Sequence, residues 1–213
     1  MKRLAIIIPA YKSTFLSAAL DSIAAQTCRD FTLYVGDDNS PEPISNIVEQ
    51  YRDQIELVYQ RFDTNLGGKD LVAQWERSIA MSKDEPYIWL FSDDDVMEAN
   101  CVEQLLKTID ATQGAYDLYH FDVDIINEHG AFERRKQGYP AVLSSYRFYR
   151  GKHAGRYAAF VVENVFSRKI YEQHHGFMKY DMAWGSDIAT WIVFSGDRDW
   201  KSGSAGMPRP ISY

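Results

Sequence analysis

Strand-like and helix-like patterns alternate four times within the first hundred residues, and this alternation restricts the possible folds more than any other feature of the chain. Short β-branched or aromatic runs predict buried strands, and apolar residues at helical spacing predict helices. Strands that alternate with helices form a mostly parallel sheet covered by helices on both faces. We therefore expect an α/β, Rossmann-like fold, with strands over 4–8, 31–35, 55–59 and 87–91 and helices over 15–23, 44–51, 71–81 and 100–109.

Three polar segments follow predicted strands at their carboxyl ends. They are Pro9-Ala10-Tyr11, Asp37-Asp38-Asn39-Ser40 and Asp93-Asp94-Asp95. Open parallel sheets bind ligands at the carboxyl ends of their strands, so we expect the three segments to line one rim. The chain has neither a Gly-x-Gly-x-x-Gly turn after its first strand nor a P-loop. A nucleotide here would therefore be held by carboxylates and a metal, and not by a glycine cradle.

The triplet Asp93-Asp94-Asp95 is the strongest single indication of a ligand. Adjacent carboxylates raise one another's pKa unless a cation lies among them. Oxygen ligands of this kind suit Mg²⁺ or Mn²⁺, which complete their shells with substrate phosphates. Two other interpretations stay open: a solvated acidic turn, and a competing metal site at Asp122 and Asp124, which alternate along a predicted strand over 115–126. Three adjacent aspartates lack the spacing of an EF-hand calcium loop.

The second half of the chain is less regular. We expect a strand over 157–166, a short helix or turn over 167–174 and a helix over 188–194. Asp187 lies at the expected N-terminus of this last helix, where the helix dipole favours a carboxylate. Taken alone, that residue is most simply a helix cap. The aromatic residues of this half, Trp184 among them, are expected to be mostly core, with a minority available to stack on a sugar.

Composition narrows the class of protein. The net charge of −7 argues against nucleic-acid binding, because no basic stripe is present to neutralise a phosphate backbone. The two cysteines, Cys28 and Cys101, fit no metal spacing and predict free thiols in a reduced cytosolic setting. No apolar stretch is long enough to span a bilayer, so we expect a soluble chain.

Taken together, these segments resemble family 2 glycosyltransferases of the GT-A fold. The resemblance covers residues 3–105 most clearly and continues more weakly to Asp187. It rests on five motifs in order along the chain, the third of which has Asn where the family has Gly. They are Ile6-Ile7-Ile8-Pro9-Ala10-Tyr11, Leu20-Asp21-Ser22-Ile23 with Gln26-Thr27, Val35-Gly36-Asp37-Asp38-Asn39-Ser40, Asn65-Leu66-Gly67 and Asp93-Asp94-Asp95. Any one of them is weak, but five at the strand ends where the fold needs them are strong.

The resemblance implies a role for each matched position. Asp38 would accept a hydrogen bond from the nucleotide base, which suits the N3–H of a uracil or thymine, and Asp187 would be the general base. The metal, Mg²⁺ or Mn²⁺, would be bound by Asp94 and Asp95. The implied nucleotide-binding residues are Pro9, Ala10, Tyr11, Asp38, Lys69, Asp93 and Asp94.

Two departures from the family pattern bear on these roles. Many members carry an Arg-Asn pair in the helix before the acidic strand end, where this chain has Trp75-Glu76. The diphosphate contacts would then come from Lys12, Lys69 or Arg77. In the second departure, Ser186 replaces the Glu of the family's Glu-Asp pair, so that Asp187 is the one carboxylate left there.

The implied function is that of an inverting, metal-dependent hexosyltransferase. It would move a sugar from a nucleoside-diphosphate sugar, with UDP or dTDP favoured, to a hydroxyl of a saccharide or lipid-linked acceptor in polysaccharide or glycolipid synthesis. Residues 1–105 would form the nucleotide-sugar-binding half and residues 106–213 the acceptor-binding half of one domain, the latter mixed in topology and truncated at its C-terminus. The implied location is cytoplasmic, with peripheral association at the inner face of the cell membrane left open.

Two other functions are weighed against this one. A sugar nucleotidyltransferase uses a similar sheet and a metal, but it needs a glycine-rich loop with Lys or Arg after the first strand, and Pro9-Ala10-Tyr11-Lys12-Ser13 is poor in both. A non-catalytic nucleotide-binding or scaffold domain is kept open by Ser186 and Trp75, which depart from the family pattern. That reading predicts nucleotide binding without turnover.

Overall fold

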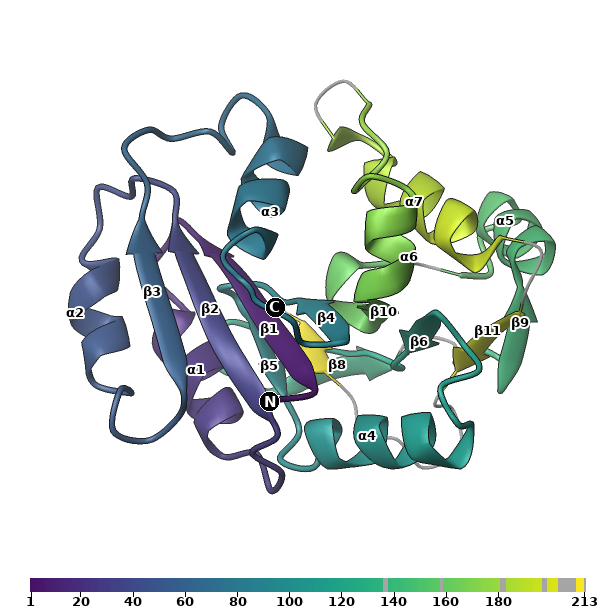
Figure 1. Cartoon of the computed structure of the whole chain (residues 1–213), viewed down its shortest axis with the longest axis horizontal. Coiled ribbons are helices and arrows are strands. Elements are labelled where there is room, and N and C mark those ends of the chain that lie inside the picture. Colours follow the sequence, from purple (N-terminus) through teal and green to yellow (C-terminus); the bar gives the residue numbers. More distant parts are fainter. Residues whose placement is uncertain (136–137, 158, 181–182, 197–198, 203–209, 213) are drawn as a thin grey trace.

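The computed structural model describes residues 1–135, 138–157, 159–180, 183–196, 199–202 and 210–212 of the 213-residue chain. Within these residues the main sheet has eight strands, in the order β3-β2-β1-β4-β10-β6-β11-β9 (Figure 1). The first four strands in that order run parallel to one another. They are β1 (Leu4–Ala10), β2 (Phe31–Asp37), β3 (Leu57–Arg61) and β4 (Tyr87–Leu90). The predicted parallel α/β sheet is therefore confirmed.

The remainder of the sheet is mixed, as expected for the second half of the chain. Strand β10 (Asn164–Ser167) is antiparallel to both β4 and β6 (Leu118–His120). Strand β11 (Asp199–Ser202) is parallel to β6 and antiparallel to β9 (Val142–Ser144). A second sheet has the order β5-β12-β7-β8, formed by Asp95–Met97, Pro210–Ser212, Asp124–Ile126 and Phe132–Arg135.

Helices cover both faces of the main sheet, and side chains that alternate along β1 separate two cores. Leu4, Ile6 and Ile8 face one core, and Ala5 and Ile7 face the other. The first core contains residues of α1 (Leu16–Ala24), α2 (Ile44–Glu49) and α4 (Cys101–Ala111). The second contains residues of α3 (Leu71–Ile79), α5 (Ser145–His153), α6 (Arg168–Gln173) and α7 (Ser186–Ser195). Figure 1 shows α5, α6 and α7 on the side of the molecule away from α1 and α2.

Two predicted strands of the second half were wrong in extent. The strand expected over 115–126 is divided into β6 and β7, which belong to different sheets. The strand expected over 157–166 begins only at Asn164, after a 3₁₀ turn over Val161–Glu163. Buried Glu163 accepts a hydrogen bond from the backbone N–H of Phe160 at 2.7 Å and contacts His120 Nε2 at 2.6 Å. These contacts satisfy the carboxylate locally and favour the turn over an extended chain.

Both cysteines are free thiols, as predicted, with Cys101 buried and Cys28 half-buried. Among the described residues, the helices are all too short or too polar to cross a bilayer.

Candidate nucleotide-sugar site

Hydrogen bonds that involve backbone groups and polar side chains join the three polar strand ends into one rim. The N–H of Asp38 donates to the carbonyl of Ala10 at 2.9 Å, and Ser40 Oγ donates to the carbonyl of Tyr11 at 2.5 Å. Asp93 Oδ2 accepts from the backbone N–H groups of Tyr11 and Lys12, at 2.8 and 2.9 Å. The segments that follow β1, β2 and β4 are therefore in direct contact, as the strand order predicted.

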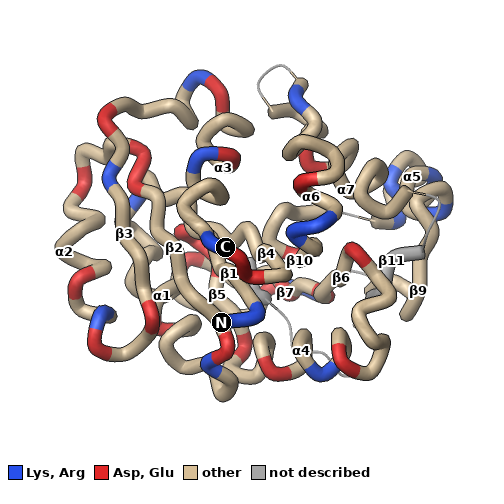
Figure 2. The backbone as a smooth tube through the Cα atoms, viewed as in Figure 1, with Lys and Arg blue, Asp and Glu red and all other residues tan. Residues whose placement is uncertain are grey.

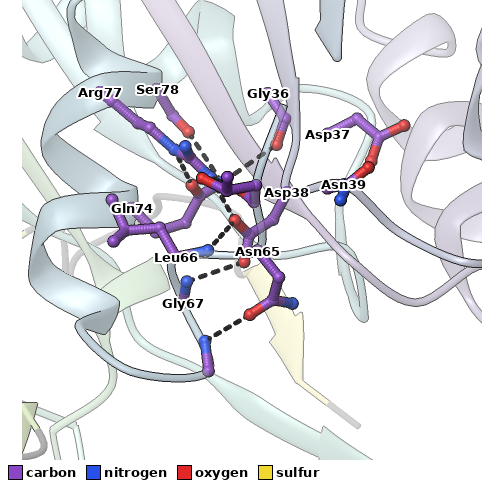
Figure 3. Close-up of polar contacts among 12 residues, drawn as sticks. Gly36, Asp37, Asp38, Asn39, Asn65, Leu66, Gly67, Gln74, Arg77 and Ser78 are labelled. Carbon is purple, nitrogen blue, oxygen red and sulfur yellow. Dashed lines mark hydrogen bonds and ion pairs between the residues drawn. The ribbon is translucent and has the colours of Figure 1, made fainter. Parts of the chain in front are cut away.

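Asp38 is a buried carboxylate of this rim with three hydrogen-bond donors (Figure 3). Its Oδ1 accepts from the N–H of Leu66 at 2.7 Å, and its Oδ2 accepts from the N–H of Gly67 at 2.8 Å. Arg77 of α3 forms an ion pair with the same carboxylate. The residue is 3% exposed, so its charge is balanced inside the protein by these three donors.

Two backbone requirements explain the motif residues around Asp38. A Cβ atom at Gly67 would lie 2.8 Å from Asp38 Oδ2, so the Asn-x-Gly turn needs a glycine there. Asn39 has a φ of 54°, in the left-handed region that Asn tolerates better than most residues. The replacement of the family's Gly by Asn therefore preserves the turn.

Asp37 is a structural residue of the rim that the motif comparison did not single out. It is fully buried and accepts hydrogen bonds from the N–H of Ser40, from the Tyr59 hydroxyl and from Arg61 Nη1, at 2.8, 2.6 and 2.9 Å. Arg61 also donates to the Asn39 side chain and to the Ser40 carbonyl, at 2.9 and 2.8 Å. These contacts fix the turn that carries Asp38. Tyr59 and Arg61 of the neighbouring strand β3 were the available sequence signal for this role. They could be assigned to Asp37 only once the register between β2 and β3 was known.

The three residues of the acidic triplet have different environments. Asp93 is half-buried, and burial raises its pKa, although the two backbone N–H donors oppose that shift. Asp94 is exposed and accepts a hydrogen bond from Ser92 Oγ. Asp95 begins β5 and is 6% exposed. The triplet is therefore not a uniform acidic turn, and Asp94 is the member that faces solvent.

These carboxylates fit a hard divalent ion that takes part of its ligands from the substrate. Among the described residues, no three His, Cys, Asp or Glu side chains are close enough together to enclose a metal on their own. Mg²⁺ commonly uses only one or two carboxylates together with substrate phosphates and water. The exposed carboxylate of Asp94, next to Asp95, meets that requirement.

The competing acidic pair has other contacts. Asp124 binds Arg135 through two hydrogen bonds, of 2.9 and 3.0 Å, and Asp122 accepts from the N–H of Tyr139 at 3.2 Å. The break between β6 and β7 also removes the strand alternation that was expected to place the two side chains on one face.

The remaining residues predicted to bind the nucleotide differ in their exposure to solvent. Tyr11 is 40% exposed, Pro9 is half-buried and Ala10 is fully buried at the end of β1. Lys12 and Lys69 are exposed beside the rim. Arg77, considered for the diphosphate, instead pairs with Asp38 and donates to the carbonyl of Thr64 at 2.8 Å. The arrangement favours the two lysines for contacts with a diphosphate.

Asp187 lies in the first turn of α7, at the helix N-terminus where the sequence placed it. Burial raises its pKa, and the positive charge of Lys152 on α5 lowers it to a smaller extent. A half-buried carboxylate with a raised pKa has the properties of a general base. Trp184, three residues earlier, is 82% exposed.

Ser186 and Glu76, both departures from the family pattern, form structural contacts. Ser186 is fully buried, and its Oγ accepts from the N–H of Tyr180 at 3.1 Å. Glu76 accepts from the N–H of Phe177 at 2.6 Å and from the Tyr171 hydroxyl, while the Trp75 ring packs edge-on against Phe177. Both positions hold the loop that precedes α7 against the rest of the protein.

Comparison with known proteins gives a family match over most of the chain. The family that matches is described as glycosyl transferase family 2, and the match covers residues 5–173. A curated relative is the poly(ribitol-phosphate) beta-N-acetylglucosaminyltransferase TarS of Staphylococcus aureus, 29% identical over 134 residues. That alignment covers 61% of this chain and 22% of the relative. The chain thus spans about a fifth of the length of the curated relatives it matches.

Solved structures of S. aureus TarS have a similar fold. The crystal structure of residues 1–349 in complex with UDP-GlcNAc has a TM-score of 0.77 and 16% identity, covering 100% of this chain and 58% of that one. A crystal structure of S. aureus TarS has a TM-score of 0.78 and 15% identity, covering 100% of this chain and 36% of that one. At these identities the likeness establishes the fold, with the GT-A arrangement that the motifs predicted.

Proposed function

Because the chain belongs to glycosyl transferase family 2, we propose that it transfers a sugar from a nucleoside-diphosphate sugar to a hydroxyl of a saccharide or lipid-linked acceptor. The observation that carries this proposal is the joining of three strand ends into one rim, where Asp93 accepts from the N–H groups of Tyr11 and Lys12 and the adjacent Asp94 is exposed. Such a rim offers aromatic, cationic and anionic groups to the base, the diphosphate and a metal, respectively.

The preferred donors in this proposal carry uracil or thymine. Asp38 would accept the N3–H of the base through Oδ2, which has one present donor, the N–H of Gly67, whereas Oδ1 already accepts from Leu66 and Arg77. Pro9, Ala10 and Tyr11 would flank the base, and Asp93 would reach the ribose. The crystal structure of S. aureus TarS with UDP-GlcNAc supports a UDP-linked donor.

The chemistry rests on two groups of residues. Asp94 and Asp95 would hold Mg²⁺ or Mn²⁺, which when bound neutralises negative charge on the leaving diphosphate. Lys69 and Lys12 would contact the diphosphate oxygens. Asp187 would take the proton from the acceptor hydroxyl, whose oxygen attacks the anomeric carbon from the face opposite the leaving group and inverts its configuration. General base assistance is typically worth roughly 10²–10⁴-fold in rate.

The two halves of the chain have separate roles in this proposal. Residues 1–105 bind the donor, and residues 106–213 bind the acceptor. We place the reaction on the cytoplasmic side of the membrane, in polysaccharide or glycolipid synthesis. The activity of the longer relatives, which transfer N-acetylglucosamine to a poly(ribitol-phosphate), supports a polymer as the acceptor.

Calorimetry of nucleotide binding tests the proposal. UDP, dTDP and GDP are titrated with and without Mn²⁺ into the wild type, Asp94→Ala and the matched control Asp53→Ala, which removes an exposed carboxylate after α2. We expect UDP or dTDP to bind only with Mn²⁺, and Asp94→Ala alone to abolish binding. Binding of no diphosphate under either condition would reject the donor site.

The same protein distinguishes the two alternative functions. A non-catalytic binding domain would bind UDP but would release no UDP from UDP-sugars in the presence of any acceptor. A sugar nucleotidyltransferase would instead consume a nucleoside triphosphate and a sugar phosphate, releasing pyrophosphate.

A further inference from the structure

Helix α5 concentrates positive charge in an acidic protein. Residues 145–157 contain Arg147, Arg150, Lys152 and Arg156 and no Asp or Glu, whereas the whole chain has a net charge of −7. Figure 2 shows Lys and Arg gathered on this helix, at the edge of the molecule. The three arginines are exposed. None of them takes part in an ion pair within the part of the chain that the structure describes.

The arginines surround a cavity of about 390 Å³. Its lining consists of Tyr146, Arg147, Arg150, Gly151, Ala154, Arg156 and Tyr157. The Arg150 guanidinium lies 5.7 Å from the centroid of the Tyr146 ring, and the Tyr157 ring lies so close to Gly151 that any Cβ there would overlap it. The cavity therefore combines three guanidinium groups with two aromatic rings, and it is large enough for a small ligand.

Guanidinium groups recognise phosphate oxygens through paired hydrogen bonds, and tyrosine rings offer flat contact to a sugar or polyol. Among the described residues that line the cavity there are three arginines and no carboxylate, which is more positive charge than an uncharged sugar requires. A ligand that repeats phosphate and polyol units matches both kinds of side chain.

The cavity lies beside the helix that carries the proposed general base. Ser145 Oγ at the start of α5 donates to the carbonyl of Gly196 after the end of α7, at 2.9 Å. Lys152, in the last turn of α5, is close enough to lower the pKa of Asp187 at the start of α7. The start of α5 therefore lies at the end of α7, and Lys152 near the other end of α5 is within electrostatic reach of Asp187.

We propose that the α5 cavity binds a phosphodiester group of an anionic polyol-phosphate or saccharide-phosphate acceptor and thereby presents a neighbouring hydroxyl to Asp187. This inference rests on the proposed function, and it names the class of acceptor. A neutral glycan would offer no counterion to the three arginines.

The test measures binding of a glycerol-phosphate oligomer and of neutral dextran, by calorimetry at several salt concentrations. The variants are the triple substitution Arg147→Ala, Arg150→Ala and Arg156→Ala, the single substitution Arg150→Ala, and the control Lys107→Ala, which removes an exposed cation from α4. We expect the oligomer but not dextran to bind the wild type. The affinity for the oligomer should fall roughly tenfold for each arginine removed. Added salt should weaken binding less in the triple variant than in the wild type, because fewer charges take part.

Donor binding to the same variants separates this inference from the proposed function. UDP affinity in Mn²⁺ should be unchanged in the triple variant, and a wild type that binds no UDP would count against the proposed function alone. Equal oligomer affinity of wild type and triple variant would overturn the inference. Binding to vesicles of anionic phospholipid but not to the oligomer would also overturn it, since it would assign the cavity to a lipid headgroup.

Discussion

The Glu76 carboxylate accepts a hydrogen bond from the backbone N–H of Phe177 at 2.6 Å, joining α3 to a loop 101 residues further along the chain. The same carboxylate accepts from the Tyr171 hydroxyl of α6. Gly176 has a φ of 99°, and a Cβ there would overlap the Glu76 carboxylate. One glutamate therefore holds the segment beside Met178, whose N–H donates to Thr190 of α7, and so supports the helix that carries Asp187.

Replacing Glu76 tests that connection. Glu76→Ala leaves the Phe177 N–H and the Tyr171 hydroxyl without their acceptor, and we expect the free energy of unfolding to fall by about 1–3 kcal/mol. The sugar-transfer rate should fall more than UDP affinity, because Asp187 loses its support while the donor rim is retained. Chemical denaturation and steady-state kinetics measure the two effects. The control Glu172→Ala removes an exposed carboxylate of α6 and should change neither.

The ion pair between Arg77 and Asp38 predicts a second loss of stability. Arg77→Ala leaves the buried Asp38 carboxylate with only its two backbone donors, and we expect a cost on the order of 3 kcal/mol. UDP affinity should fall as well, because the turn that holds Asp38 loosens. Thermal unfolding monitored by circular dichroism would show the difference from Arg52→Ala, an exposed arginine after α2. Equal melting temperatures would contradict a structural role for the pair.

Asp187 predicts a pH dependence of the reaction. A general base must be deprotonated, and burial raises the pKa of Asp187 above the ordinary aspartate value. The rate should therefore fall as the pH drops through that raised pKa, so that the acidic limb lies above the range in which an ordinary aspartate titrates. Asp187→Asn should lower kcat by roughly 10²–10⁴-fold with UDP affinity unchanged. A variant with full activity would remove Asp187 from the mechanism.

Lys152 allows the same pKa to be shifted without touching the base. Its positive charge lowers the pKa of Asp187, so Lys152→Ala should raise that pKa and move the acidic limb of kcat to higher pH. Lys169→Ala removes an exposed lysine of α6 and serves as the control. The pH profiles of the two variants, measured at one ionic strength, should separate. Profiles that coincide would show that the charge of Lys152 does not reach Asp187.

The exposed ring of Trp184 is expected to contact the acceptor. It is 82% exposed and lies three residues before Asp187, so Trp184→Ala should leave the melting temperature unchanged. KM for a saccharide acceptor should rise severalfold, since the loss of an aromatic face removes about 1 kcal/mol of stacking. Tyr149→Ala, at an exposed aromatic residue of α5 outside the cavity lining, provides the comparison. An unchanged KM would place Trp184 outside the acceptor site.

The first half of the fold could be predicted because its signals are local. Apolar runs such as Leu4–Ile8 can only be buried strands, and parallel strands bring their carboxyl ends together. That rule placed Tyr11, Asp38 and Asp93 near one another before any coordinates were considered. The long-range partners of individual side chains could not be predicted in this way. Arg77 was one of three candidates for the diphosphate contacts, and its ion pair with buried Asp38 could not be read from the sequence.

The second half could not be predicted equally well, because its elements depend on distant partners. The residues of β5, Asp95–Met97, follow the acidic triplet and form a strand only by pairing with β12, more than a hundred residues later. Glu163 interrupts a strand-like run because its buried carboxylate finds partners in Phe160 and His120. Hydrophobic periodicity along the sequence does not predict contacts between residues this far apart. The position of Asp187 was predictable because a helix N-terminus is set by neighbouring residues.

The cations of α5 also act before any contact is made. A molecule with a cluster of basic residues at one edge, while its whole charge is negative, has an electric dipole moment with its positive end toward that cluster. In the field of a negatively charged chain such a molecule rotates until its α5 edge leads. The orientation of the protein toward an anionic acceptor would then be set during diffusion. Most productive encounters would begin at α5, on the side of the protein that carries Asp187, with the acidic faces turned away from the acceptor.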